Sequence, residues 1–244
     1  MNEEVPAESE THRRLETDLV RLRERAADMG RWSLGMVHDG WRAFRAGDLS
    51  RAQQVLDRDT ELDRYDQEVE HEVIGFLVTR QPAGGDLRGA AALLKATTHL
   101  DRMGRLGFDI ARITIPPVNP DVPESLLQML DTMDERAEEI GAAAVEALQR
   151  GDADRARALL PQDDEVDRLH REATRLIVGE LQRDPRLAQR LSGALLVARH
   201  FERISDNACK VCERTIYAAT GQRRAEYLPR HPYHPYALEG SSGP

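Results

Sequence analysis

The chain of 244 residues contains one pattern twice, at an offset of 104 residues. Gly47-Asp48 returns as Gly151-Asp152 (151 − 47 = 104), and the acidic segment Asp59–Asp63 returns as Asp163–Asp167. Both copies lie within long stretches in which apolar residues recur every three or four positions, which is the spacing of one face of an α-helix. The recurrence indicates a duplicated helical unit. We therefore expect an all-α protein made of two tandem three-helix bundles with six long helices.

Changes in composition divide the chain into five parts. Residues 1–11 are acidic and without periodicity, and are expected to form a disordered N-terminal extension. The first bundle is expected over 12–115 and the second over 123–221, with a proline-rich linker over 116–122 between them. The proline-rich tail, 222–244, is again expected to be disordered.

Within each copy, glycine and proline residues separate three helical stretches. In the first copy the apolar periodicity predicts helices over about 12–47, 49–79 and 86–114. In the second copy it predicts a helix over 123–151, one that ends at Asp184-Pro185, and one that carries the segment 199–213.

The overall composition limits the class of partner. Aromatic residues make up 5% of the chain and charged residues 32%, a balance that suits bundles burying narrow stripes of Leu, Ala and Val. The net charge of −9 argues against nucleic acid as the main partner, because phosphate binding requires clustered cations. No apolar run reaches the length of a membrane span, and the N-terminus has no signal-peptide core. The sequence therefore predicts a soluble cytoplasmic protein.

The second copy carries two acidic pairs, Asp163 with Asp167 and Glu202 with Asp206, each with a spacing of four residues. Residues at i and i+4 share one face of a helix, so both carboxylates of a pair point the same way. If the two helices pack antiparallel, the pairs face one another and repel. A bound hard cation, a shared proton or inserted arginines would relieve this repulsion. All-oxygen ligands suit iron(III), magnesium, manganese or calcium.

The first copy repeats only part of this arrangement. Asp59, Asp63 and Asp101 occupy the matching positions, but Arg105 stands where the fourth acid is expected. A metal ion and neutralisation by Arg105 are both open interpretations there. In either copy the acids could instead form solvated faces offset by neighbouring arginines.

Two further patterns suggest metal or redox chemistry, and both have simpler explanations. Cys209-x-x-Cys212 supplies the chain's only cysteines, which is too few for a zinc site without histidines and more consistent with small buried packing residues. Glu68-x-x-His71 and Asp167-x-x-His170 resemble half of a di-iron motif. Of these histidines, His170 is at best an accessory ligand beside Asp167.

Three segments resemble motifs of the PhoU family, the accessory regulators of bacterial phosphate uptake. Residues 80–88 (RQPAGGDLR) are similar to the family's QQPxxxDLR segment, and residues 93–104 (LLKATTHLDRMG) to its LKIASDLERIG helix. Residues 198–206 (ARHFERISD) are similar to the ARYLERIGD helix of the second repeat, with Ser205 in place of the usual Gly. The resemblance covers roughly 12–221 and implies a fold of two three-helix bundles.

The resemblance also implies a function. The expected protein is a non-enzymatic negative regulator of phosphate uptake and phosphate-starvation signalling. It would link the ATPase subunit of a phosphate ABC transporter to a membrane sensor histidine kinase, form a homodimer, and meet the membrane only through these partners. The carboxylate clusters would bind metal ions, iron first, with magnesium, manganese or zinc as alternatives. The expected ligands are Asp163, Asp167, Glu202, Asp206, Asp59, Asp63 and Asp101.

Three other interpretations remain open at this point. One is a di-iron carboxylate enzyme of oxidase type that uses the same acids with His71 or His170. Another is a helical adaptor that binds no metal. The third is a divergent paralogue of the family with a different partner.

Overall fold

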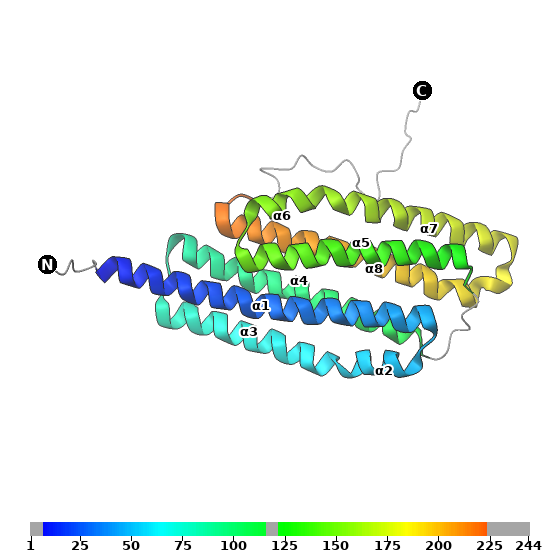
Figure 1. The fold of residues 1–244 in the computed structure, drawn as a ribbon, viewed down its shortest axis with the longest axis horizontal. Helices are drawn as coiled ribbons and strands as arrows, with labels where there is room; N and C mark the ends of the chain where they lie inside the picture. Colours follow the sequence, from blue (N-terminus) through cyan, green and yellow to red (C-terminus); the bar gives the residue numbers. More distant parts are fainter. Residues whose placement is uncertain (1–6, 116–121, 224–244) are drawn as a thin grey trace, which may run out of the picture.

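The computed structural model describes residues 7–115 and 122–223, and every structural statement below refers to these two ranges. Within them the chain is helical except for the short turns between helices and at the ends, and it has no strand, which confirms the all-α prediction (Figure 1). Most of the expected linker (116–122) and of the expected tail (222–244) lies outside the described residues. The first bundle consists of α1 (Ala7–Ala46), α2 (Leu49–Asp57), α3 (Asp59–Arg80) and α4 (Gly84–Ile113). The second consists of α5 (Glu124–Arg150), α6 (Ala153–Leu159), α7 (Asp163–Arg183) and α8 (Ala188–Thr220), with short 3-10 turns η1 (Leu160–Gln162) and η2 (Pro185–Leu187).

The six predicted helices correspond to α1, α2 with α3, α4, α5, α6 with α7, and α8. The second and fifth are each interrupted once, the second at Arg58 and the fifth by η1. Helix α1 begins at Ala7, which places residues 7–11 of the expected disordered extension in a helix. Alanine and glutamate favour helix without requiring an apolar face, so the periodicity gave no sign of this additional turn.

The turn after the first helix of each bundle has the same geometry in both copies. Gly47 and Gly151 adopt φ values of 64° and 66°, in the left-handed region that glycine enters without strain. The next backbone N–H, of Asp48 or Asp152, bonds to the carbonyl five residues earlier at 2.8 or 2.9 Å, as in a Schellman motif. Each aspartate then caps the following short helix. The 104-residue repeat in the sequence is therefore a repeat of backbone conformation.

The two bundles are joined along their inner helices. Helices α1 and α8 each pack along both α4 and α5, so these four form the centre of the molecule (Figure 1). Helix α3 covers α1 and α4 from one side, and α7 covers α5 and α8 from the other. The buried apolar side chains form one continuous cluster that includes residues of both bundles. The two repeats thus share a single core.

Helices α1 and α4 come into backbone contact at a pair of glycines. A Cβ atom on Gly107 would lie 2.5 Å from the backbone N of Val37 and 2.6 Å from the carbonyl carbon of Met36. A Cβ atom on Gly40 would lie 2.5 Å from the carbonyl oxygen of Gly107. Such distances are too short for any non-bonded contact, so the helices approach this closely only because both positions are glycine.

Each helix that the structure describes is too short or too polar to cross a lipid bilayer.

Candidate metal centres

The second bundle brings the two predicted acidic pairs together on α7 and α8. Asp163 is the first residue of α7, and Ser205 of α8 donates its hydroxyl hydrogen to Asp163 Oδ1 with an O–O distance of 2.5 Å. This bond fixes the start of α7 against the face of α8 that carries Glu202 and Asp206. We refer to Asp163, Asp167, Glu202 and Asp206 as the α7/α8 cluster.

Glu202 of the α7/α8 cluster is largely buried, with 13% of its side chain exposed. Its Oε1 accepts a hydrogen bond from Arg199, but its Oε2 is buried and has no hydrogen-bond partner. Burial raises the pKa of Glu202 to about 7, and the nearby charges of Asp206 and Asp167 act in the same direction, while Arg199 opposes them. The ionised form of this carboxylate is therefore poorly compensated by the protein itself.

Asp163 is perturbed in the same way. Burial raises its pKa to about 6, with further contributions from Asp206 and Asp167, although the hydrogen bond from Ser205 lowers it. The four acids are thus close enough to act on one another across the two helices. They do not converge on one point, since no three of them have ligand oxygens within 4.8 Å of one another in the described structure.

The first bundle has Arg105 at the position that Asp206 takes in the second bundle. Arg105 contacts all three predicted acids of this copy, through Nη1 to Asp59 at 3.3 Å, Nη2 to Asp63 at 2.5 Å and Nε to Asp101 at 3.0 Å. Charge-assisted bonds of this kind are among the stronger hydrogen bonds of proteins. The guanidinium group therefore occupies the place that a cation would take in this α3/α4 cluster.

The two clusters differ in their fit to a metal ion. The α7/α8 cluster offers four oxygen-donor side chains, one of which has a buried oxygen without a partner, and this set fits a hard cation such as iron(III), magnesium or manganese. The α3/α4 cluster also has such an oxygen, Asp101 Oδ1, but Arg105 contacts all three of its acids, so this cluster does not fit a metal ion. Both copies have the same helical scaffold, so the exchange of Arg105 for Asp206 accounts for the difference.

The positions of Glu68 and His71 do not favour the alternative of a di-iron enzyme. His71 is exposed on α3, and Glu68 forms ion pairs with Arg25 at 2.8 Å and Arg64 at 3.1 Å. A di-iron carboxylate site requires such groups to project into a four-helix core. His170, by contrast, is half-buried on α7, three residues after Asp167. Burial and the charge of Arg199 lower its pKa, while the charge of Asp167 raises it.

The two cysteines lie in the interior of the second bundle. Cys209 and Cys212 are both buried on α8, and burial raises the pKa of Cys212 to about 12. A thiol with so high a pKa is a poor nucleophile and a poor metal ligand. The prediction that these residues serve packing is consistent with this placement.

The hydrogen bond from Ser205 to Asp163 was not predicted from the sequence. Ser205 differs from the glycine usual at this position in the related motif, and its partner Asp163 lies 42 residues away. The substitution itself is the only signal in the sequence, and its meaning depends on how α7 packs against α8.

The unusual pKa values predict how the stability of the metal-free protein depends on pH. The pKa of Glu202 is about 7 in the folded state and about 4.5 in the unfolded chain. Between these two pH values the folded protein therefore binds a proton at Glu202 that the unfolded chain has released. The cost of the charged form is fully present above pH 7 and is relieved as the pH falls. As the pH falls from 8 to 6, we expect Glu202 to raise the free energy of unfolding by roughly 1 kcal/mol.

Urea unfolding in the presence of a chelator, at several pH values, measures this effect. Asp163 contributes in the same direction at lower pH, so the informative quantity is the difference between wild type and Glu202→Gln. The variant should lose this part of the pH dependence. An identical pH profile for the two proteins would contradict the assignment.

The fold and these clusters together define a class of protein: a duplicated helical bundle that carries a carboxylate cluster on one repeat and its arginine-neutralised counterpart on the other. A family model, the PhoU domain, matches residues 26–114 and 130–215, one segment in each bundle. The chain belongs to the PhoU family.

Individual relatives support this membership over most of the chain. The PhoU homolog of Rhizobium meliloti (strain 1021), named a phosphate-specific transport system accessory protein, is 28% identical over 204 residues, covering 84% of this chain and 86% of the relative. The homolog from Clostridium acetobutylicum is 27% identical over 214 residues, covering 87% of this chain and 97% of the relative. These relatives are named as accessory proteins, in agreement with the expectation of a protein that is not an enzyme.

Solved structures agree with the fold. The crystal structure of PhoU from Pseudomonas aeruginosa matches with a TM-score of 0.79 and 28% identity, covering 85% of this chain and 99% of that one. The PhoU structure from Streptococcus pneumoniae also gives a TM-score of 0.79, at 21% identity, and supports the fold alone.

Proposed function

We propose that this protein is an accessory regulator of a phosphate transport system and that it binds a metal ion or a small metal cluster at the α7/α8 cluster. Membership of the PhoU family supports the regulatory role, and the names of the relatives supply the link to phosphate transport. The single observation that supports metal binding is the contrast within one chain. Each cluster has one buried carboxylate oxygen without a partner, Asp101 Oδ1 in the first repeat and Glu202 Oε2 in the second. In the first repeat one arginine, Arg105, contacts all three acids, whereas the second repeat has a fourth acid, Asp206, at that position.

The finer role is that of a negative regulator. The protein would couple the ATPase subunit of a phosphate ABC transporter to a membrane sensor histidine kinase and restrain the phosphate-starvation response when phosphate is ample. The inner helices α1, α4, α5 and α8 pack on one another, so the outer helices offer the larger free surface for docking. A metal ion at the α7/α8 cluster would neutralise its carboxylates and hold α7 in a fixed position on α8. We also propose a homodimer as the functional form.

Affinity capture tests this role directly. The tagged protein is recovered from cells grown in high and in low phosphate, and co-purifying proteins are identified by mass spectrometry. Recovery of the transporter ATPase or of the sensor kinase, more abundant in high phosphate, is the expected result. Reproducible capture of an unrelated partner and of neither expected protein would overturn it and point to a paralogue with a different role.

A further inference from the structure

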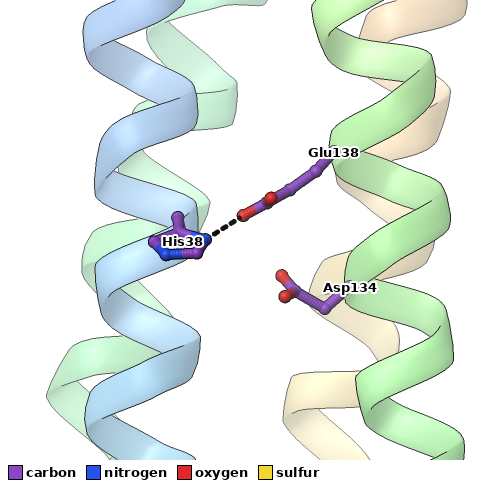
Figure 2. A group of neighbouring side chains, drawn as sticks. All are labelled: His38, Asp134 and Glu138. Carbon is purple, nitrogen blue, oxygen red and sulfur yellow. Dashed lines mark hydrogen bonds and ion pairs between the residues drawn. The ribbon is translucent and has the colours of Figure 1, made fainter.

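A different group of histidine and acidic side chains lies between the two bundles, where α1 packs against α5. It consists of His38 on α1 and of Asp134 and Glu138, which are four residues apart on α5 (Figure 2). One ligand atom of each residue lies within 4.8 Å of the other two, and this is the one such trio among the residues that the structure describes. In Figure 2 the three side chains point into the same space between the helices.

Asp134 is the unusual member of this trio. Only 6% of the residue is exposed, and its Oδ1 is buried with no hydrogen-bond partner. Figure 2 shows its carboxylate directed toward His38, whereas the dashed line joins His38 Nδ1 to Glu138 Oε1 at 2.9 Å. Burying a carboxylate oxygen costs free energy unless a hydrogen bond compensates it, and none of the described side chains donates one to Asp134 Oδ1.

Two other acids of α5, Asp131 and Glu124, have partners on α1. Asp131 accepts a hydrogen bond from Trp41 Nε1 at 3.1 Å and from Arg45 Nε at 3.3 Å. Glu124 accepts one from Arg45 at 2.6 Å. Arg42 is exposed and acts on Asp134 only through its charge. The α1/α5 contact therefore provides partners for Asp131 and Glu124 but not for Asp134 Oδ1.

We propose that His38, Asp134 and Glu138 form a binding site for one divalent transition-metal ion, with zinc as the best-suited ion. An imidazole nitrogen with two carboxylate oxygens suits zinc, iron(II) or manganese(II), and the imidazole disfavours magnesium and calcium. A metal would supply the missing partner of Asp134 Oδ1. Burial, together with the charges of Glu138 and Asp131, raises the pKa of Asp134 to about 8, which shows how poorly the protein alone compensates this carboxylate.

The present distances require only a small adjustment to close around an ion. Zinc lies about 2.0–2.2 Å from nitrogen and oxygen ligands, so the ligand atoms of a tetrahedral site are roughly 3.3 Å apart. The side chains of His38 and Glu138 are 45% and 31% exposed, which leaves them room to rotate toward Asp134. A water molecule would complete the coordination on the open side.

The internal repeat shows that the fold does not require these residues. At the offset of 104 residues, the positions matching Asp134, Glu138 and His38 are Gly30, Leu34 and Ala142 (134 − 104, 138 − 104 and 38 + 104). Gly30 is packed against Val145, and Leu34 lies over Gly141. The same helix pair thus forms a close apolar contact at one place and a polar trio at its counterpart.

A metal ion at this trio would join the two repeats directly, since His38 belongs to the first bundle and both acids belong to the second. This role is separate from that of the α7/α8 cluster, which lies within the second bundle. Each site can therefore be tested without the other.

The test uses the full chain with the α7/α8 cluster disabled by Asp163→Asn and Glu202→Gln. After removal of metal by a chelator, Zn²⁺ is titrated by calorimetry, and Co²⁺ is titrated while its visible absorption is recorded. We expect one Zn²⁺ per chain and Co²⁺ bands typical of a low-coordinate site with a nitrogen ligand. His38→Ala and Asp134→Asn, each added to this background, should weaken Zn²⁺ binding at least tenfold and remove the Co²⁺ bands.

Two matched controls and one structural check make the result decisive. Glu139→Gln changes an exposed acid next to Glu138, and His71→Ala removes an exposed histidine of α3, so neither should affect binding. Thermal unfolding of the metal-free variants verifies folding, and the near-isosteric Asp134→Asn decides the outcome if His38→Ala is unstable. Absence of Zn²⁺ binding in the background, or binding that both site variants leave unchanged, overturns the proposal.

Discussion

Replacing Glu202 by Gln together with Asp163 by Asn is expected to abolish metal binding at the α7/α8 cluster while leaving the protein folded. Both substitutions keep the size of the side chain and remove the charge that a hard cation requires. Loss of direct ligands should weaken binding by about a hundredfold or more, because even indirect supporting contacts are worth roughly 10–100-fold. Elemental analysis of protein purified without added chelator, with the α1/α5 trio intact, measures the loss as a change in metal content per chain.

The first repeat provides the matched control for this experiment. Asp59→Asn with Asp63→Asn removes two acids at the equivalent helical positions, where Arg105 already supplies the positive charge. These changes should leave the metal content unchanged. The reciprocal variant Arg105→Asp should add a metal site to the α3/α4 cluster. If the α7/α8 variant retains its full metal content, this cluster is not the metal site.

Replacing Gly107 by alanine is expected to destabilise the protein strongly, although the change adds only one methyl group. The new Cβ would lie 2.5 Å from the backbone of Val37, and a backbone atom cannot rotate away as a side chain can. Helices α1 and α4 would have to separate, which loosens the core shared by both bundles. Overpacking of this kind costs about 1–3 kcal/mol, and the backbone contact places Gly107→Ala at the upper end of that range.

Gly75 supplies the control for this prediction. It lies in the interior of α3, and a Cβ atom there would have no neighbour within 4 Å. Gly75→Ala should therefore stabilise the protein by about 0.5–1 kcal/mol, because alanine loses less backbone entropy in a helix than glycine does. Urea unfolding midpoints of the two variants should move in opposite directions. A Gly107→Ala protein as stable as wild type would show that the two helices do not meet through backbone contact.

The helical architecture was largely predictable because the sequence patterns that specify it are local. The Gly-Asp turns, the spacing of apolar residues and the proline-rich breaks each act within one helix or one turn, and they placed all six helices. The interruption at Arg58 was missed because a single non-helical residue barely changes the apolar period. The extent of contact between α4 and α8 was also not predictable, since periodicity shows which face is apolar but not which helix covers it.

Of the candidate sites, the two carboxylate clusters were predictable from the sequence, and the trio between α1 and α5 was not. The spacing of Asp163 with Asp167 and of Glu202 with Asp206 identified the α7/α8 cluster, and Arg105 was recognised as a counter-charge because it replaces an acid in the repeat. In the trio of His38, Asp134 and Glu138, the two acids have the same spacing of four residues, but the repeat does not duplicate this pair, and its spacing does not point to His38. The members of the trio are up to 100 residues apart, and they come together only through the packing of α1 on α5.

The core that the two bundles share makes their unfolding interdependent. A chain cut between the two repeats would leave the inner faces of α1 and α4, or of α5 and α8, without the helices that cover them. Neither half is then an independent unit, although each is a recognisable copy of the other. Duplication has produced two interdependent halves, and damage to one should melt both in a single cooperative transition.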